Sequence, residues 1–483
     1  MAHQKITYGA QRLKYVLWGM LLATLFILFM LWFRSAFPMR VRIGFFGLFF
    51  LTSFFLAFPR PESWLYPLIF IFFGLGSIWV DLEPFHPSLA TLAMFSYFMF
   101  YLADRALWNR PIFIPSLPVK LCLLAVLVQC VSVVVSIHYH GQHQLNAIRE
   151  ASSIYLFLPM ILIIPTLCNT KEKLVRFLRV YLVAILIVAF SGVFQYFQTT
   201  GVSRIGMSTG YVFRIRVSGL FRHHNVLAAF LELGVPIAIA LFFKERKIKW
   251  KLLALAAVLL GVLSTLYTFS RGGLICLTIA CVITLFWRFR KKLWIPVVIF
   301  MLFVVVLVST ANVFQRQMSL FTNPKSTLME PTILHRFITY RGFARQFLSS
   351  PVSGLGWGAL PFHWGRTKLY SFWEGRHTVS EARIKNFGGL NSMFLNQAVK
   401  GGLISLTAIM LILVAAGIAL VKALRRGGGM VPIGLAAGLL GFFGHQTLGN
   451  QMHWPQANAG FWISMGLLAA YASWEVKRVK STQ

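Results

Sequence analysis

Acidic side chains are scarce in this sequence. Its 483 residues include 12 Asp and Glu against 46 Lys and Arg, and only two of the acids are aspartates, Asp81 and Asp104. Metal ions such as Mg²⁺ and Ca²⁺ are held in proteins largely by carboxylate oxygens. The sequence therefore offers little material for metal-dependent chemistry that relies on clustered carboxylates, and we expect no cofactor.

Cysteine is also rare, and its placement argues against two further classes of site. The thiols lie in or beside apolar runs, and none forms a CxxC pair or a Cys/His cluster. We therefore expect neither a disulfide framework nor a zinc site. The five cysteines are Cys122, Cys130, Cys168, Cys276 and Cys281.

Apolar runs, in contrast, recur from end to end. The chain is 58% hydrophobic and 12% charged, with a mean hydropathy of +0.71. The runs are about 16 to 24 residues long, close to the ~20 that a helix needs to cross a bilayer, and they lack the strict alternation of membrane-spanning strands. The sequence predicts an all-α, polytopic bundle of 12 to 14 membrane spans. The first span is expected to be a retained N-terminal anchor. We place the spans near 15–33, 43–58, 65–80, 88–103, 116–137, 152–168, 174–197, 225–243, 250–268, 273–287, 293–311, 402–421, 430–448 and 457–473.

The formal net charge of +34 first suggests a nucleic-acid partner. The basic residues are spread over many short loops, whereas a nucleic-acid binder gathers them on one soluble face, so we reject that class. Basic loops mark the cytoplasmic side of a membrane protein. We assign five to that side, with the C-terminus cytoplasmic: 171–179, 244–251, 288–292, 422–426 and 476–480.

Three segments are left on the opposite, outward side. They are 198–224, the turn around Arg271, and the long stretch 312–390. The last of these divides the chain into three parts: membrane helices at 1–311, an external loop at 312–390 and further membrane helices at 391–483. Segment 198–224 contains four arginines and no acid. Positive charge on this side opposes the usual bias. An anionic ligand bound on the outward face is the simplest physical explanation.

The stretch "RIRVSGLFRHHN" (214–225) is the first candidate binding site for that anionic ligand. Arg216, Arg222 and Asn225 come directly before a predicted span, and Asn225 is a favourable N-cap residue. Unpaired N–H groups at a helix start attract anions, so two added arginines make a phosphate cradle. The alternative is an interfacial loop whose arginines reach lipid headgroups.

The stretch "SRGG" (270–273) places Arg271 at the edge of a span. The closest carboxylates along the chain are Glu245 and Glu330, both remote. A half-buried arginine needs a counter-charge, which a substrate could supply. The two glycines would let the backbone turn tightly. The alternative is a side chain that extends to the membrane surface.

The stretch 330–358 is predicted to contain a helix that lies in the outer interface. Its apolar stripe would be Ile333, Phe337, Tyr340, Ala344 and Phe347, with Arg336 beside the stripe. The following "GLGWG" does not follow a βα unit, so we interpret it as a turn and not as a dinucleotide site.

Further polar residues are less specific. Asn391, Asn396 and Gln397 enter the next span, either as ligands or as hydrogen-bonding groups between helices. Asp81 and Glu83 form a DxE pattern that fits a polar turn. Five outward histidines could serve as bases: His223, His224, His335, His363 and His377.

Taken in order, these segments resemble the O-antigen ligase and Wzy-type polysaccharide polymerase superfamily of bacterial envelopes. The resemblance covers about 190 residues and adds a shared topology of many spans with one large external loop. The residues that carry it are Arg216, Gly219 and Asn225; Ser270-Arg271-Gly272; Arg336, Pro351 and Gly354-Leu355-Gly356; and Asn391 with Gly402.

The resemblance implies a metal-independent, inverting glycosyltransferase of the bacterial inner membrane. Its donor would be a glycan on undecaprenyl diphosphate at the periplasmic face, and its acceptor another glycan, lipid A core or protein. Arg216 and Arg271 would hold the diphosphate, and Arg336 would be a further contact. The family has His-Asn where this chain has Leu390-Asn391, so the catalytic base is open. Its candidates are His377, His363, Glu374 and Glu381, and the alternative is that the reaction requires no base.

Two other function classes remain. A glycosyltransferase that uses a polyprenyl monophosphate donor would act through Asp81 and Glu83. A flippase or exporter of lipid-linked sugars would line a midplane cavity with cations between repeated halves. No internal repeat is visible, and the cations gather at one surface, so the sequence favours the diphosphate enzyme.

Overall fold

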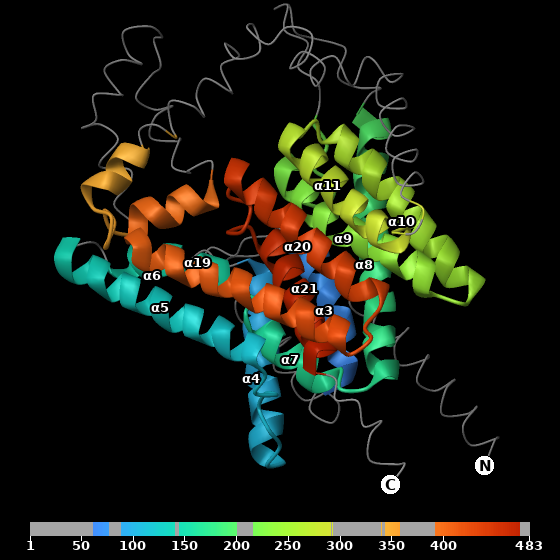
Figure 1. Cartoon of the computed structure of the whole chain (residues 1–483), viewed down its shortest axis with the longest axis horizontal. Coiled ribbons are helices and arrows are strands. Elements are labelled where there is room, and N and C mark those ends of the chain that lie inside the picture. The colour runs from blue at the N-terminus through green and yellow to red at the C-terminus, as the bar shows by residue number, and fades with distance from the viewer. Residues whose placement is uncertain are drawn as a thin grey trace, which may run out of the picture.

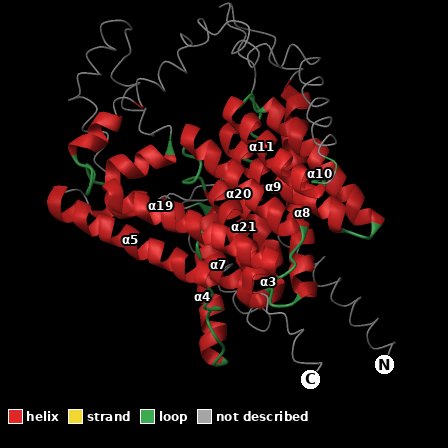
Figure 2. Ribbon diagram, in the orientation of Figure 1, coloured by secondary structure: helices red, strands yellow, loops and turns green. Residues whose placement is uncertain are grey.

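The computed structural model describes part of the chain, and that part is helical. The described residues are 61–76, 88–140, 144–199, 216–290, 292, 340, 343–357 and 392–473. Every regular element drawn there in Figure 2 is a helix. The predicted spans near 15–33, 43–58 and 293–311 lie outside these residues.

Eight of the described helical segments are long and apolar enough to cross a membrane. The all-α polytopic fold is therefore confirmed, while the predicted total of 12 to 14 spans includes segments outside the described residues. The eight are α5 (Leu117–His140), α6 with α7 (Gln144–Ser152 and Pro159–Leu167, joined through the 3₁₀ turn Ser153–Tyr155), α8 (Lys171–Thr199), α9 (His224–Lys244), α10 (Ile248–Tyr267), α11 (Arg271–Arg288), α19 (Met393–Arg425) and α20 (Met430–Leu448). The helices α3 (Pro61–Leu75), α4 (Leu89–Leu107) and α21 (Pro455–Ser473), also predicted as spans, complete the described bundle.

Helix α9 forms the centre of the bundle. Every residue from Val226 to Leu241 is buried, as expected for a helix that is apolar on all sides. In Figure 1, α9 lies with α20 and α21 in the middle of the molecule, between α5 and α19 on one flank and α8, α10 and α11 on the other. Side chains on α9 are thus shielded by neighbouring helices.

Glycines on one face of α20 allow it to pack closely on α9 and α11. A Cβ at Gly434 or Gly438 would lie 2.6 Å from the Pro236 carbonyl oxygen or 2.8 Å from that of Leu233 on α9. A Cβ at Gly441 would lie 2.9 Å from the Cys276 carbonyl oxygen on α11. Small residues at such spacing let membrane helices approach. His445 follows one turn later on the same face.

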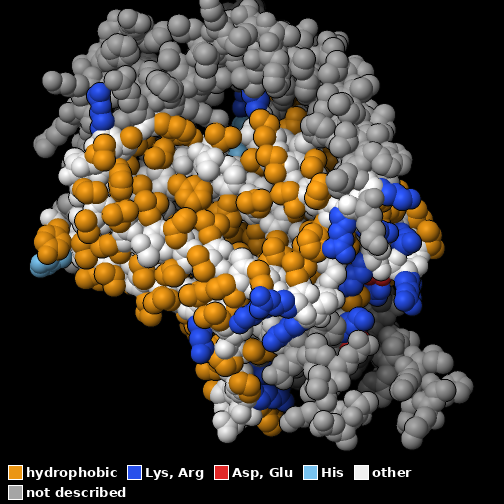
Figure 3. Space-filling view, in the orientation of Figure 1, with side chains coloured by type: hydrophobic (Ala, Val, Ile, Leu, Met, Phe, Trp, Pro, Cys, Tyr) orange, Lys and Arg blue, Asp and Glu red, His pale blue; other side chains and the backbone are white. Residues whose placement is uncertain are grey.

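Two of the basic segments assigned to one side of the membrane, 171–179 and 244–251, meet at one end of the bundle. Arg179 at the start of α8 pairs with Glu245 just after α9 through nitrogen–oxygen distances of 2.9 and 2.8 Å. Lys244 bonds the Tyr471 hydroxyl near the end of α21 at 2.8 Å. Figure 3 shows Lys and Arg gathered towards the lower right of the visible face, below a broad apolar surface. These contacts place 171–179 and 244–251 at the end of the bundle where α21 ends. The segment 476–480 lies outside the described residues, and the side of the membrane stays a prediction.

Helix α19 begins earlier than predicted and bends. It starts at Met393, where the sequence predicted a span from 402, and its backbone leaves the helical region at Gly402, with φ 61°. A Cβ at Gly402 would collide with the Val352 carbonyl. The bend therefore accommodates residues 351–354, which pack against it.

Candidate functional site

The segment that carries Arg216 is fixed to α8 and α10 by its backbone. The Val217 amide donates to the Tyr267 carbonyl at 3.2 Å. The amides of Ser218 and Gly219 both donate to Gln195 Oε1, at 2.8 and 2.7 Å. Arg216 itself is exposed. These bonds hold it beside the end of α10, from which the chain turns into α11.

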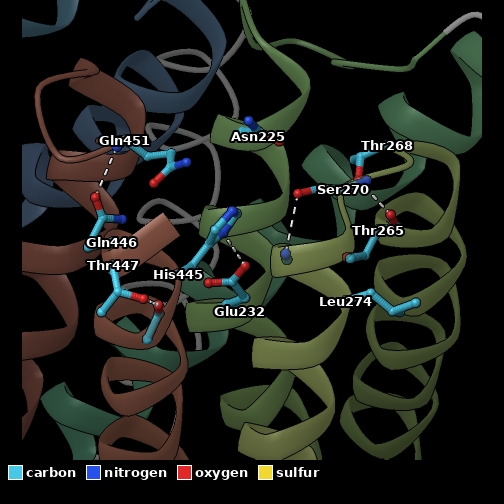
Figure 4. A network of polar contacts seen from close by, with 12 residues as sticks. Asn225, Glu232, Thr265, Thr268, Ser270, Leu274, His445, Gln446, Thr447 and Gln451 are labelled. Atoms are coloured by element: carbon cyan, nitrogen blue, oxygen red, sulfur yellow. Dashed lines mark hydrogen bonds and ion pairs between the residues drawn. The ribbon is translucent and has the colours of Figure 1, made fainter. Parts of the chain in front are cut away.

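Arg271 is the first residue of α11, and the turn before it is stabilised by side-chain caps. Ser270 is the N-cap, and its hydroxyl accepts from the Gly273 amide at 3.2 Å. The Thr268 hydroxyl accepts from the Ser270 amide, also at 3.2 Å. Figure 4 shows these residues at the start of α11. The predicted helix-edge position of Arg271 is thus a capped helix N-terminus.

The glycines after Arg271 do not make the turn as predicted. The positive φ, 52°, belongs to Phe269, while Gly272 and Gly273 lie within α11. Their lack of side chains serves packing instead. A Cβ at Gly272 would lie 3.2 Å from His445 Cδ2, and one at Gly273 would lie 2.6 Å from Ala228 Cβ.

The N-cap assignment of Asn225 is wrong. Helix α9 begins at His224, and its N-cap is His223, whose Nδ1 accepts from the Asn225 amide at 3.2 Å. An imidazole nitrogen without a proton can accept this bond as a side-chain oxygen does. Burial, followed by the nearby Arg216, lowers the pKa of His223 and so favours the neutral ring that can cap.

The start of α9 brings a second arginine segment to the same end of the bundle. His224 Nε2 lies 3.0 Å from Arg216 Nη1. Arg222 is exposed and Asn225 is half-buried. The structure therefore brings Arg216, His224 and the N-terminus of α9 together, with Arg222 in the preceding turn.

A buried acid and a buried histidine lie under the first turn of α11, and neither was predicted from the sequence. Glu232 on α9 is 0% exposed and His445 on α20 is 2% exposed. His445 Nδ1 lies 2.6 Å from Glu232 Oε1. A Cβ at Gly273 would lie 3.3 Å from the same Oε1. A carboxylate therefore does lie near Arg271 in space, although it is 39 positions away along the chain.

The described residues between 340 and 357 pack on α19 and α20. The Tyr340 hydroxyl donates to the Thr447 carbonyl at 2.7 Å. Residues 343–349 are helical, with Phe343 buried against Val399. Ala344, predicted in the apolar stripe, is exposed because Phe343 takes the inward position.

The "GLGWG" stretch forms the predicted turn, with φ of 70° at Gly354 and 98° at Gly356. The Leu355 amide donates to the Val399 carbonyl at 2.7 Å, and the Gly356 amide to the Lys400 carbonyl at 3.0 Å. The turn is thereby fixed to α19 just before its bend.

The two described polar residues at the start of α19, Asn396 and Gln397, differ in their surroundings. Gln397 is 1% exposed and accepts from Ser405, which also bonds Gln129 Oε1 on α5 at 2.9 Å. The bond between Gln397 and Ser405 lies within α19, and the contact with α5 is made by Ser405, so both interpretations of Gln397 stay open. Asn396 is 8% exposed and lies in the first turn of α19.

A second polar cluster lies near the start of α9, and it was not predicted from the sequence. Lys400 on α19 is buried and pairs with Glu150 on α6. His453 lies between α20 and α21, and burial, followed by the charge of Lys400 and the neighbouring His223, lowers its pKa to about 4. Trp454 stacks on His223 with ring centroids 6.3 Å apart. Inspection of polar residues inside apolar runs, such as Lys400, could have found this cluster.

Several predicted site residues lie outside the described residues, so the structure does not place them. They are Arg336, Leu390, Asn391, His363, His377, Glu374, Glu381, Asp81 and Glu83. Within the part of the chain that is described, no group of three or more His, Cys, Asp or Glu is arranged to hold a metal ion.

The arrangement is suited to an anion with two phosphate groups. Arg216 and Arg271 belong to segments joined by the Val217–Tyr267 bond, and the N-termini of α9 and α11 lie at the same end. Helix N-termini favour negative charge, and guanidinium groups bind phosphate oxygens through paired, charge-assisted hydrogen bonds.

One comparison with known proteins adds to this geometry. Residues 255–410 match a family model, Wzy_C, described as O-antigen ligase. The match runs from α10 to the middle of α19 and includes Arg271, whereas Arg216, Glu232 and His445 lie outside it. No curated protein matches the chain.

Proposed function

The chain belongs to the O-antigen ligase and Wzy-type polymerase superfamily through residues 255–410, and from this premise we propose that it is an inverting, metal-independent glycosyltransferase. Its donor is a glycan on undecaprenyl diphosphate, and its acceptor is a hydroxyl of a second glycan or of lipid A core. The reaction takes place at the periplasmic face of the bacterial inner membrane.

The observation that carries the proposal is the hydrogen bond between Val217 and Tyr267. It links the segment of Arg216 to the turn that leads into Arg271. Two guanidinium groups from distant parts of the sequence thereby approach the same end of the bundle. One diphosphate can bridge them, with one phosphate on each arginine.

The chemistry needs these charges in the transition state. The acceptor oxygen attacks the anomeric carbon from the face opposite the diphosphate, which inverts that centre. The bond from this carbon to the phosphate oxygen breaks, and its electron pair stays on the diphosphate. Arginines and helix N-termini that are already oriented stabilise this developing charge without a metal ion.

The proton of the acceptor hydroxyl must leave during the same step. Leu390 stands where the superfamily has the histidine that serves as base, so we propose His377 or His363 of the external loop in its place. Arg336 and Asn391 are proposed as further donor contacts, with Arg222, Asn225 and Tyr340 around the same site.

The test is transfer by purified protein in detergent with a lipid-diphosphate glycan and an acceptor. Arg216→Ala and Arg271→Ala should each lower the rate about 10²- to 10³-fold, the usual effect of losing one such donor. Arg246→Ala, an exposed arginine at the other end of the bundle, is the matched control and should match wild type.

Two results would contradict the proposal. One is near-normal release of undecaprenyl diphosphate by either site variant. The other is a strict divalent-metal requirement, since transfer should survive EDTA. Because detergent leaves no sealed compartment, product release also separates an enzyme from a flippase, which could not produce it.

A further inference from the structure

The proposed transfer leaves the buried Glu232–His445 pair unused. A carboxylate and an imidazole, 0% and 2% exposed, lie on two central helices with their oxygen and nitrogen 2.6 Å apart. Burying such groups is costly unless each finds a partner. Helices α9 and α20 could pack with apolar residues here, so the pair calls for an explanation.

The pair lies directly against the first turn of α11. A Cβ at Gly272 would lie 3.2 Å from Cδ2 and 3.4 Å from Nε2 of His445. A Cβ at Gly273 would lie 3.3 Å from Oε1 of Glu232. In Figure 4 the two side chains point toward one another between α20 and the start of α11. Both glycines directly follow Arg271.

The hydrogen bond also fixes the orientation of the imidazole. One proton lies between Nδ1 and Oε1, whichever of the two groups carries it. With Nδ1 held by α9, the Cδ2–Nε2 edge of the ring contacts Gly272. The pair therefore joins α9, α20 and the first turn of α11 at one point.

We propose that Glu232 and His445 are positioning residues for Arg271. Their hydrogen bond holds the start of α11 against α9 and α20, which keeps the Arg271 guanidinium where it meets the diphosphate. This inference rests on the proposed function. Electrostatic stabilisation of a transition state depends on donors held in place before the reaction, so loosening the support lowers the rate more than it weakens substrate binding.

The deciding variant replaces both partners together. Glu232→Leu/His445→Phe removes the hydrogen bond but leaves no buried charge unpaired, and buried ion pairs often accept such apolar replacement without loss of stability. We expect a folded protein with kcat lowered about 10- to 100-fold, the effect of a small displacement of a catalytic group. KM should stay within about 3-fold, because the substrate contacts remain.

Two further variants separate the hydrogen bond from packing. Glu232→Gln keeps an oxygen that can accept from Nδ1 and should retain most of kcat. Thr284→Val removes a buried hydrogen bond in the other half of α11 and should leave kcat unchanged. If the double variant is folded and matches wild type in kcat, the positioning role is overturned.

Binding of inorganic pyrophosphate to the purified protein gives a readout besides turnover. Arg271→Ala should weaken binding at least about 10-fold, and adding the double replacement to Arg271→Ala should cause no further loss, because the pair acts through Arg271. A further loss would overturn the inference by showing a separate contact with the ligand. If Arg271→Ala itself changed neither binding nor transfer, the proposed function would fail first.

Discussion

Arg271 shows how far a single residue can be interpreted from sequence. Its position at a helix edge was predictable, because a serine and two glycines separate two apolar runs there. Its surroundings were not, since Glu232 and His445 lie 39 and 174 positions away along the chain and meet α11 only after the helices pack. The search along the sequence found Glu245, which pairs with Arg179 at the opposite end of the bundle.

A substitution at Gly272 tests whether the packing of the first turn of α11 matters for Arg271. Gly272→Ala should displace His445 and Leu448, since the added Cβ would lie 3.2 and 3.1 Å from their atoms. We expect transfer to fall about 10-fold while the protein stays folded, because the first turn of α11 shifts. Gly417→Ala on α19, where a Cβ meets nothing within 4 Å, is the control. Equal rates for both variants would contradict the packing argument.

His453 predicts a dependence of stability on pH. Its pKa is about 4 in the folded protein and about 6.5 when unfolded. Below pH 6.5 the unfolded chain takes up a proton that the folded chain does not, so the free energy of unfolding falls from about pH 6.5 to about 4. His223, whose pKa is also lowered, acts in the same direction.

Thermal unfolding in detergent between pH 7 and pH 4.5 measures this effect. The midpoint for wild type should fall with pH, and the fall should be shallower in His453→Leu. A variant with the same pH dependence as wild type would show that His453 is not the responsible group.

At the scale of elements, the apolar runs predicted the helices but not how they end. The span predicted at 152–168 contains a 3₁₀ turn and α7, because Pro159 starts a new helix after the turn, and the apolar segment begins earlier, at Ala147 in α6. The N-cap of α9 moved from Asn225 to His223, since an imidazole took the role usually given to an amide or hydroxyl. Such endings depend on side chains brought in by neighbouring elements.

The bend in α19 gives the prediction at this scale. Gly402→Ala would place a side chain at φ 61° and against the Val352 carbonyl. Strain of this kind costs about 1–3 kcal/mol, so the unfolding midpoint should fall. Gly417→Ala, in the same helix with open space around it, should leave it unchanged or raise it slightly. A Gly402→Ala protein as stable as wild type would argue against the bend.

At the scale of the whole molecule, charge distribution was the most informative signal in the sequence. The basic segments 171–179 and 244–251 lie at one end of the bundle, and the segments of Arg216 and Arg271 lie at the other. The Lys400–Glu150 pair and the Glu232–His445 pair could not be predicted, because each joins groups more than 200 residues apart. The sequence therefore predicted the candidate site, and the packing shows which residues lie against it.

The claim on which the account depends is that Arg216 and Arg271 face the periplasm. Single cysteines at Arg222, near the arginine site, and at Arg246, at the opposite end, can be introduced after the native cysteines are replaced. Intact cells treated with a membrane-impermeant maleimide should label the cysteine at 222, and the one at 246 only after permeabilisation. The reverse pattern would put the arginines in the cytoplasm and contradict the account.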